Sequence, residues 1–271
     1  MNVFHLEAVT LQDAWFQLVW NLMRGNAPKS VYEIDKGSYV GQKRLEYEFV
    51  TVQINEPGTR PLIPEIPPQL AIPAPVEGMD YVNDYFTNYL MSTDVAENET
   101  YIYGTWLAPG VERVIEQLRG APGNNQAVIS IGGWAPDEVR STEGFMSIPV
   151  KGERSDGTFI DTDNFIDPGT GQRDPACLRL VDFRLDQSNR LHMVVYFRSW
   201  DLWGGFPANL AGLQLVKEYV GQAIGAVDGR IIAASKGLHL YDHCIEVAAQ
   251  RLGMEAGNVD DFFNWIQDAG H

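Results

Sequence analysis

Two cysteines, Cys177 and Cys244, are the side chains of this sequence best suited to bond covalently with a substrate. Cys177 follows the segment "DPA" and opens an apolar stretch that predicts a strand. A thiol becomes a nucleophile where a nearby cation favours its thiolate, and Arg198, at the end of the next predicted strand, is the candidate cation. A strand-end cysteine without such a neighbour is more often a small buried hydrophobe. From residue types alone, both interpretations of Cys177 stand.

A histidine and a tyrosine form a second chemical pair. His239 and Tyr241 lie two residues apart on a predicted strand, so their side chains project from one face and can bind a single hydroxyl group together. His243 follows His239 by four residues, a spacing that suits metal ligation on a helix. No acidic third ligand is evident in "GLHLYDH". We therefore predict no metal site and keep a metal-dependent hydrolase as an alternative.

A longer pattern lies between these two sites. The run "RSWDLWGGFPANLAGLQL" spans residues 198–215, after "DPAC" ending at Cys177 and before "GLHLYDH" at 237–243. Together these segments resemble thymidylate synthases, whose signatures are Pro-Cys, Arg-Ser-x-Asp-x-x-x-Gly-x-Pro-x-Asn and His-x-Tyr. The resemblance covers about residues 171–245 and is weaker upstream. It implies a thymidylate synthase-like α+β fold, a single domain over residues 1–271 with a mixed β-sheet covered by helices.

The resemblance also implies a mechanism. C5 of a pyrimidine is a poor nucleophile until a group adds at C6, and a thiolate adds there readily. Cys177 would attack C6 of a pyrimidine nucleoside monophosphate, C5 would capture the methylene of 5,10-methylenetetrahydrofolate, and β-elimination would release the folate. Folate is thus expected as the co-substrate and the nucleotide as the other ligand.

Several further residues match the family's nucleotide contacts. A guanidinium and a hydroxyl, those of Arg198 and Ser199, are expected to hold the phosphate. Lys36 in "EIDKGSY" resembles the arginine of the family's phosphate loop, although it is equally well explained as a turn lysine. The remaining contacts implied by the resemblance are the base at Asn209, the 3′-hydroxyl at His239 and Tyr241, and the side of the nucleotide at Ala176.

Three residues match the positions that handle folate and the C5 proton. Asp201 corresponds to the residue that hydrogen-bonds the pterin, and Gly205 to the one that leaves room for it. Tyr103 of "IYGTW" matches the tyrosine that helps to remove the C5 proton, although an interior aromatic residue is the alternative. Glu77 and Asp84 are positional candidates for the family's general acid/base carboxylate.

The sequence departs from the family in four places. Leu178 replaces a histidine, which leaves the choice between uracil and cytosine open, because the Asn209 amide can serve either base by flipping. Ala176 replaces proline and leaves room for a 2′-hydroxyl. Neutral residues 124–126 replace paired arginines that bind phosphate across the dimer. The terminal segment "DDFFNWIQDAGH" does not match the tail that excludes water in methylating members.

These departures favour hydroxymethylation of CMP or dCMP. Thymidylate synthesis from dUMP, or hydroxymethylation of dUMP, is the runner-up. A non-catalytic nucleotide-binding module is an alternative of a different class, in which Cys177 would be dispensable.

The sequence predicts both helices and strands along the chain, and these elements must position the candidate site residues. Thr10 and Asp13 resemble a capping box before a helix, and a polar turn between two apolar runs predicts a hairpin that brings Cys177 and Arg198 together. The Pro-rich stretch 57–75 predicts an irregular segment, and 147–174 a long loop. The expected helices are 11–24, 76–91, 111–118 and one after Asn209; the expected strands are 45–54, 127–131, 177–185, 190–199 and 230–241.

Composition limits the functional class. The 271 residues carry a formal net charge of -16, which argues against a nucleic-acid-binding protein. No apolar run is long enough to span a membrane and the start does not resemble a signal peptide, so we expect no membrane partner and a cytoplasmic location. Two cysteines are too few for a disulfide framework. The resemblance also implies a homodimer.

Overall fold

Two β-sheets, rather than one, form the centre of the fold. The structure is a computed structural model that describes residues 1–25, 27–35, 39–96, 101–132, 176–255 and 258–268. The larger sheet has the order β1-β4-β9-β7-β6-β5 and the smaller one β2-β3-β10-β8. Both sheets mix parallel and antiparallel pairs. The predicted α+β class with mixed sheet and covering helices is confirmed.

The bounds of the elements are as follows. The strands are β1 Phe4–Ala8, β2 Lys29–Glu33, β3 Lys43–Tyr47, β4 Val50–Ile54, β5 Val128–Ser130, β6 Leu178–Leu185, β7 Arg190–Phe197, β8 Trp200–Asp201, β9 Val227–Ser235 and β10 Leu238–Tyr241. The helices are α1 Leu11–Met23, the short η1 Pro68–Leu70, α2 Met79–Asp84, the π-helical η2 Tyr85–Leu90, α3 Gly104–Gly120, α5 Gly205–Ile224, α6 Asp242–Arg251 and α7 Val259–Asp268.

The chain passes from one sheet to the other at three two-residue breaks. They separate β3 from β4, β7 from β8, and β9 from β10, and fall at residues 48–49, 198–199 and 236–237. The predictions of single strands over 45–54 and 230–241 were therefore wrong. A continuous apolar pattern does not reveal a break of this kind, because the residues on both sides are buried in the same core. Arg198 and Ser199 lie in the middle break.

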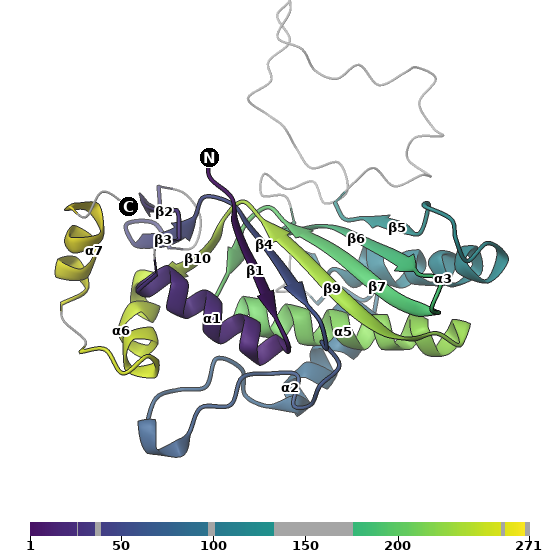
Figure 1. Cartoon of the computed structure of the whole chain (residues 1–271), viewed down its shortest axis with the longest axis horizontal. Helices are drawn as coiled ribbons and strands as arrows, with labels where there is room; N and C mark the ends of the chain where they lie inside the picture. The colour runs from purple at the N-terminus through teal and green to yellow at the C-terminus, as the bar shows by residue number, and fades with distance from the viewer. Residues whose placement is uncertain (26, 36–38, 97–100, 133–175, 256–257, 269–271) are drawn as a thin grey trace, which may run out of the picture.

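Helices α1, α3 and α5 lie on one side of the larger sheet (Figure 1). Alternate residues of β7 face them and are buried, namely Leu191, Met193, Val195 and Phe197. The predicted amphipathic helix is confirmed as α1, and the Thr10 hydroxyl accepts a hydrogen bond from the Asp13 N–H at 3.2 Å. The predicted hairpin is confirmed as β6 and β7.

Two helices begin earlier than the sequence pattern predicted. Helix α3 starts at Gly104, not near residue 111, and includes Pro109. Helix α5 starts at Gly205, before Asn209, because the Asp201 carboxylate accepts hydrogen bonds from the backbone N–H groups at its start. The helix predicted over 76–91 is present in two parts, α2 and η2. The loop predicted at 147–174 lies outside the described residues.

A buried lysine makes the stability of this fold depend on pH. The side chain of Lys217 on α5 is fully buried, and its Nζ donates to the Gly229 carbonyl oxygen at 2.5 Å and lies 3.2 Å from the Asp228 carboxylate. Burial lowers the pKa of Lys217 from 10.5 to about 8, although Asp228 opposes the change. The folded protein therefore binds fewer protons than the unfolded chain between these two pH values.

We predict that this group adds to stability as pH rises from about 8 to 10.5, by about 3 kcal/mol in total. Urea unfolding at pH 7 to 10 should show that the free energy of unfolding of the wild type increases relative to that of Lys217→Met across this range. The difference arises because only wild type releases a proton on folding there. Parallel curves for the two proteins would contradict the prediction.

Candidate active site

The two predicted strands of the hairpin bring Cys177 and Arg198 together. The Arg198 backbone N–H donates to the Cys177 carbonyl oxygen at 2.9 Å, and its Nε donates to the Ala176 carbonyl oxygen at 3.3 Å. Cys177 is half-buried, whereas Ala176 and Leu178 on either side of it are buried. The turn before β6 therefore presents the thiol beside a guanidinium rather than inside the core.

A phenol lies beside the residue that carries the thiol. The Leu178 N–H donates to the Tyr103 hydroxyl oxygen at 3.3 Å, which places this phenol beside the peptide that follows Cys177. Burial raises the pKa of Tyr103 well above its usual value, with smaller contributions from Tyr85, Tyr101 and Cys177. Tyr103 is therefore a neutral phenol at neutral pH, able to donate or accept a hydrogen bond but not to act as a phenolate.

A glycine allows Tyr103 to reach this position. A Cβ atom on Gly104 would lie 1.8 Å from the Ser92 carbonyl oxygen, so only glycine permits the two segments to pass. The close approach joins the end of the η2 region to the start of α3 and sets where Tyr103 lies.

His239 and Tyr241 lie on β10 in the smaller sheet, with their rings 4.5 Å apart. His239 Nδ1 is 2.8 Å from the Gly237 carbonyl oxygen, which can only accept, so Nδ1 carries the proton and Nε2 the lone pair. Burial lowers the pKa of His239, while the bond to Gly237 and the nearby Asp201 oppose this. Nε2 is buried and has no partner among the described residues. A ligand hydroxyl could donate to it.

Tyr241 faces the same region as the thiol. Burial raises its pKa to about 12, and Asp201, Tyr39 and Cys177 add to the change. Tyr39, from the segment between β2 and β3, has its ring 4.6 Å from that of Tyr241. Tyr241 is therefore a neutral phenol that lies beside His239 and is influenced by the Cys177 thiol.

Asn209 lies on the first turns of α5 and its amide is bonded on both sides. Trp200 Nε1 donates to Asn209 Oδ1 at 2.9 Å, and Asn209 Nδ2 donates to the Tyr85 hydroxyl oxygen at 2.8 Å. Gly212, one turn further along α5, allows this packing, since a Cβ there would lie 2.7 Å from the ring of Tyr85.

Asp201 and Gly205 lie at the start of α5. The Asp201 carboxylate accepts from the backbone N–H groups of Trp203, Gly204 and Gly205 at 2.8 to 3.0 Å. A carboxylate has about four acceptor positions, so one remains for a ligand. A Cβ on Gly205 would lie 3.2 Å from the Cβ of Asp201, so the absence of a side chain at Gly205 allows the Asp201 carboxylate to approach the start of α5.

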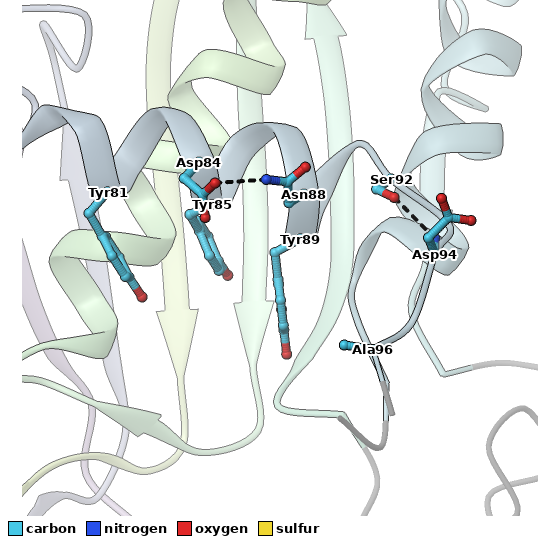
Figure 2. Close-up of a pocket in the computed structure, with 8 residues that line it drawn as sticks. All are labelled: Tyr81, Asp84, Tyr85, Asn88, Tyr89, Ser92, Asp94 and Ala96. Atoms are coloured by element: carbon cyan, nitrogen blue, oxygen red, sulfur yellow. Dashed lines mark hydrogen bonds between the residues drawn. The ribbon is translucent and has the colours of Figure 1, made fainter. Parts of the chain in front are cut away.

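A hollow of about 490 Å³ adjoins this region (Figure 2). Tyr81, Tyr85 and Tyr89 point the same way from α2 and η2, and successive rings are stacked 6.3 and 5.1 Å apart. Asp84 lies on the lining with its carboxylate bonded to Asn88 at 2.7 Å. The hollow can hold a planar ligand next to Asn209, because Tyr85 belongs to both.

Other predicted residues take different places. Glu77 is exposed ahead of α2, and Ser199 lies half-buried in the break between β7 and β8. Lys36 lies outside the described residues. Asn124 donates to backbone oxygens at the end of α3.

His239 and His243 lie on a strand and a helix, not one turn apart on one helix, and His243 Nδ1 is 3.1 Å from Gln42 Oε1. No cluster of three or more metal-ligating side chains occurs in the described ranges.

Three residues of the site were missed from sequence, namely Trp200, Tyr85 and Tyr101. Trp200 occupies a variable position of the long motif, and Tyr81, Tyr85 and Tyr89 follow a four-residue spacing that indicated a helix face. The phenol of Tyr101 is hydrogen-bonded to that of Tyr103 and to the backbone of Cys177.

Comparison with known proteins identifies the family. Residues 109–259 match the family model described as thymidylate synthase. The chain belongs to the thymidylate synthase family. A relative from Methanosarcina mazei, named "Putative thymidylate synthase", is 26% identical over 247 residues, covering 88% of this chain and 89% of its own length. One of the same name from Methanosarcina barkeri is 25% identical over 244 residues, with the same coverage of both chains.

Thymidylate synthase family enzymes transfer a one-carbon unit to C5 of a pyrimidine nucleotide and use methylenetetrahydrofolate as co-substrate. Membership supports this general activity for the present chain. Among the helices that the structure describes, none is long and apolar enough to cross a membrane.

The neutral state of His239 leads to a test. We predict that His239→Ala weakens nucleotide binding by about tenfold or more, because the unpartnered Nε2 is the acceptor expected to bind the sugar hydroxyl. Equilibrium dialysis with CMP, dCMP and dUMP would measure the change in dissociation constant. His192→Ala is the matched control, because His192 contacts Asp186 near the turn of the β6–β7 hairpin. Equal dissociation constants for the wild type and His239→Ala would show that the imidazole does not contact the nucleotide.

Proposed function

We propose that this chain catalyses one-carbon transfer from 5,10-methylenetetrahydrofolate to C5 of a pyrimidine nucleoside monophosphate through a covalent bond between Cys177 and C6. The observation that carries the proposal is the thiol's position, half-buried beside Arg198 and among Tyr101, Tyr103 and Tyr241. A thiol that served only packing would have no need of a guanidinium and three phenols around it.

The nucleotide would extend across both sheets from the break after β7. Arg198 and Ser199 would hold its phosphate, and His239 and Tyr241 its 3′-hydroxyl, with the hydroxyl donating to Nε2 of His239. Asn209 would read the base edge, and Ala176 would lie alongside the nucleotide. Lys36 would add a second cation at the phosphate.

The carrier of the one-carbon unit would occupy the hollow lined by tyrosines. Its flat rings suit a hollow lined by the aromatic side chains of Tyr81, Tyr85 and Tyr89. The one free acceptor position of Asp201 would bond the pterin, beside Gly205, and Asp84 is the better placed of the two carboxylate candidates because it lines the hollow. Tyr103 would assist the loss of the C5 proton as a neutral hydrogen-bonding group.

The Cys177 sulfur bonds to C6, and C5 then attacks the methylene carbon, which breaks the first of its two bonds to folate nitrogens. A base takes the C5 proton, and the second of these bonds breaks, so that tetrahydrofolate leaves and an exocyclic methylene remains at C5. Water adds to this methylene to give a hydroxymethyl group, whereas hydride from the tetrahydrofolate gives a methyl group and dihydrofolate. In either case the electrons return through C5 and C6 and expel the Cys177 thiolate.

Two sets of substrates are candidates. Hydroxymethylation of CMP or dCMP is supported by the apolar residues Ala176 and Leu178 on either side of the nucleophile. Conversion of dUMP to dTMP is supported by the names of the relatives from Methanosarcina. A third possibility, hydroxymethylation of dUMP, combines the uracil base of the second set with the hydroxymethyl product of the first.

One experiment tests the reaction and its products. The protein is incubated with methylenetetrahydrofolate and 5-tritiated CMP, dCMP, UMP or dUMP, and both tritium release and product mass are measured. We expect Cys177→Ala to lose tritium release by a factor of about a thousand or more, as expected for loss of a covalent nucleophile. A gain of a methyl or a hydroxymethyl mass identifies the product.

Cys244→Ala is the matched control. Burial raises the pKa of Cys244 to about 12, so its thiol is not ionised at neutral pH, and its removal should leave the rate unchanged. Full activity of Cys177→Ala would exclude covalent catalysis and favour a non-catalytic role for the cysteine.

We also propose that residues 1–271 form a single domain and that the active protein is a homodimer. Support comes from one continuous core that includes residues of both sheets. The outward side chains of β7 and β9 include Val194, Tyr196, Ile232 and Ala234, on the face opposite α5. Ile232 is 39% exposed, which gives a second copy apolar surface to cover. Light scattering should give twice the monomer mass; a monomer mass would contradict the dimer.

A further inference from the structure

Trp200 is held in one orientation by its neighbours. Its ring is stacked on Phe197 with centroids 3.9 Å apart and lies 4.7 Å from Phe206, and only 3% of the residue is exposed. Its backbone N–H donates to the Gly237 carbonyl oxygen at 2.9 Å as part of the smaller sheet. The indole therefore cannot turn away from Asn209 without breaking the packing on both faces.

The chemistry of indole determines which end of the Asn209 amide faces it. An indole N–H can only donate, so the group 2.9 Å away must be the carbonyl oxygen Oδ1. A flipped amide would set two N–H donors against each other at that distance. On the other side, Nδ2 donates to the Tyr85 hydroxyl oxygen at 2.8 Å. The flip that would let one asparagine serve either base is blocked.

We propose that Trp200, with Tyr85, is a positioning residue that sets base specificity by locking the Asn209 amide in one orientation. This rests on the proposed function in assigning the base edge to Asn209 and C6 of the base to the Cys177 thiol. Each amide atom uses one hydrogen-bonding position on its neighbour and keeps one for a ligand. The base therefore meets a fixed order of one acceptor, Oδ1, and one donor, Nδ2.

The surroundings indicate which base fits this order. Tyr85 continues through Tyr89 to Tyr103, with ring centroids 5.1 and 5.5 Å apart, and Tyr103 lies beside the peptide after Cys177. A base with C6 at the thiol has C5 and C4 on this tyrosine side. Nδ2, which faces Tyr85, then meets the C4 substituent, and it suits a carbonyl oxygen rather than an amine.

The other end of the amide agrees. Trp200 belongs to β8, which pairs with the β10 strand that carries His239, so Oδ1 faces the N3 side of the base. An acceptor there suits the N3–H of uracil, whereas cytosine has a lone pair at N3. The locked amide thus favours uracil nucleotides and, between the two candidate sets, disfavours CMP and dCMP.

The test uses Trp200→Phe, which keeps an aromatic ring but removes the N–H, and Tyr85→Phe, which removes only the hydroxyl. Dissociation constants of dUMP and dCMP are measured by equilibrium dialysis, alongside kcat/KM. We expect wild type to prefer dUMP and the preference to fall about tenfold or more in Trp200→Phe, because the amide can then flip. A smaller fall is expected for Tyr85→Phe.

Trp203→Phe is the matched control, since Trp203 is also buried but packs against Trp15 and should keep the wild-type ratio. If Trp200 and Tyr85 had only a structural role, their substitution would weaken the binding of both nucleotides equally. An unchanged ratio of the dUMP and dCMP dissociation constants in both Trp200→Phe and Tyr85→Phe would therefore overturn the proposal. A wild-type preference for dCMP would also overturn it. Selective dUMP binding without tritium release would instead leave the lock intact and refute the proposed reaction.

Discussion

The hydrogen bond from the Arg198 N–H to the Cys177 carbonyl oxygen closes the open end of the hairpin formed by β6 and β7. The rest of the site depends on it, because the chain leaves the larger sheet directly after this bond and enters the smaller one at Trp200. The open end of one hairpin thus positions the Cys177 thiol, the Arg198 guanidinium and the Trp200 indole close together. Strand pairing, rather than a loop, fixes these positions, which suits a reaction that needs several groups at fixed distances.

Much of the site could be predicted from sequence because its residues occur in contiguous motifs. Cys177, Arg198, Asn209, His239 and Tyr241 were named from short segments, and the structure brings them into one region through the hairpin, α5 and β10. The hairpin was predictable since two apolar runs flank a polar turn. Helix α1 was predictable from its cap and its periodicity.

The remaining features depend on contacts between distant segments. The breaks at 48–49 and 236–237 were missed because burial on both sides maintains the apolar pattern across them. The lock on Asn209 joins Tyr85 to a residue 124 positions away, and a sequence pattern contains no information on such a contact. Helix α5 begins earlier than predicted because Asp201 accepts hydrogen bonds from the backbone N–H groups at its start, and this carboxylate keeps one position for a ligand.

The smaller sheet has a consequence for how activity would be lost on heating. Strand β10 has four residues and β8 only two, yet together they carry the sugar-binding pair, the indole and the helix cap. Leu238 and Leu240 of β10 are fully buried and belong to the same hydrophobic core as the larger sheet. The smaller sheet therefore cannot open without disrupting that core, so loss of activity on heating should coincide with loss of secondary structure.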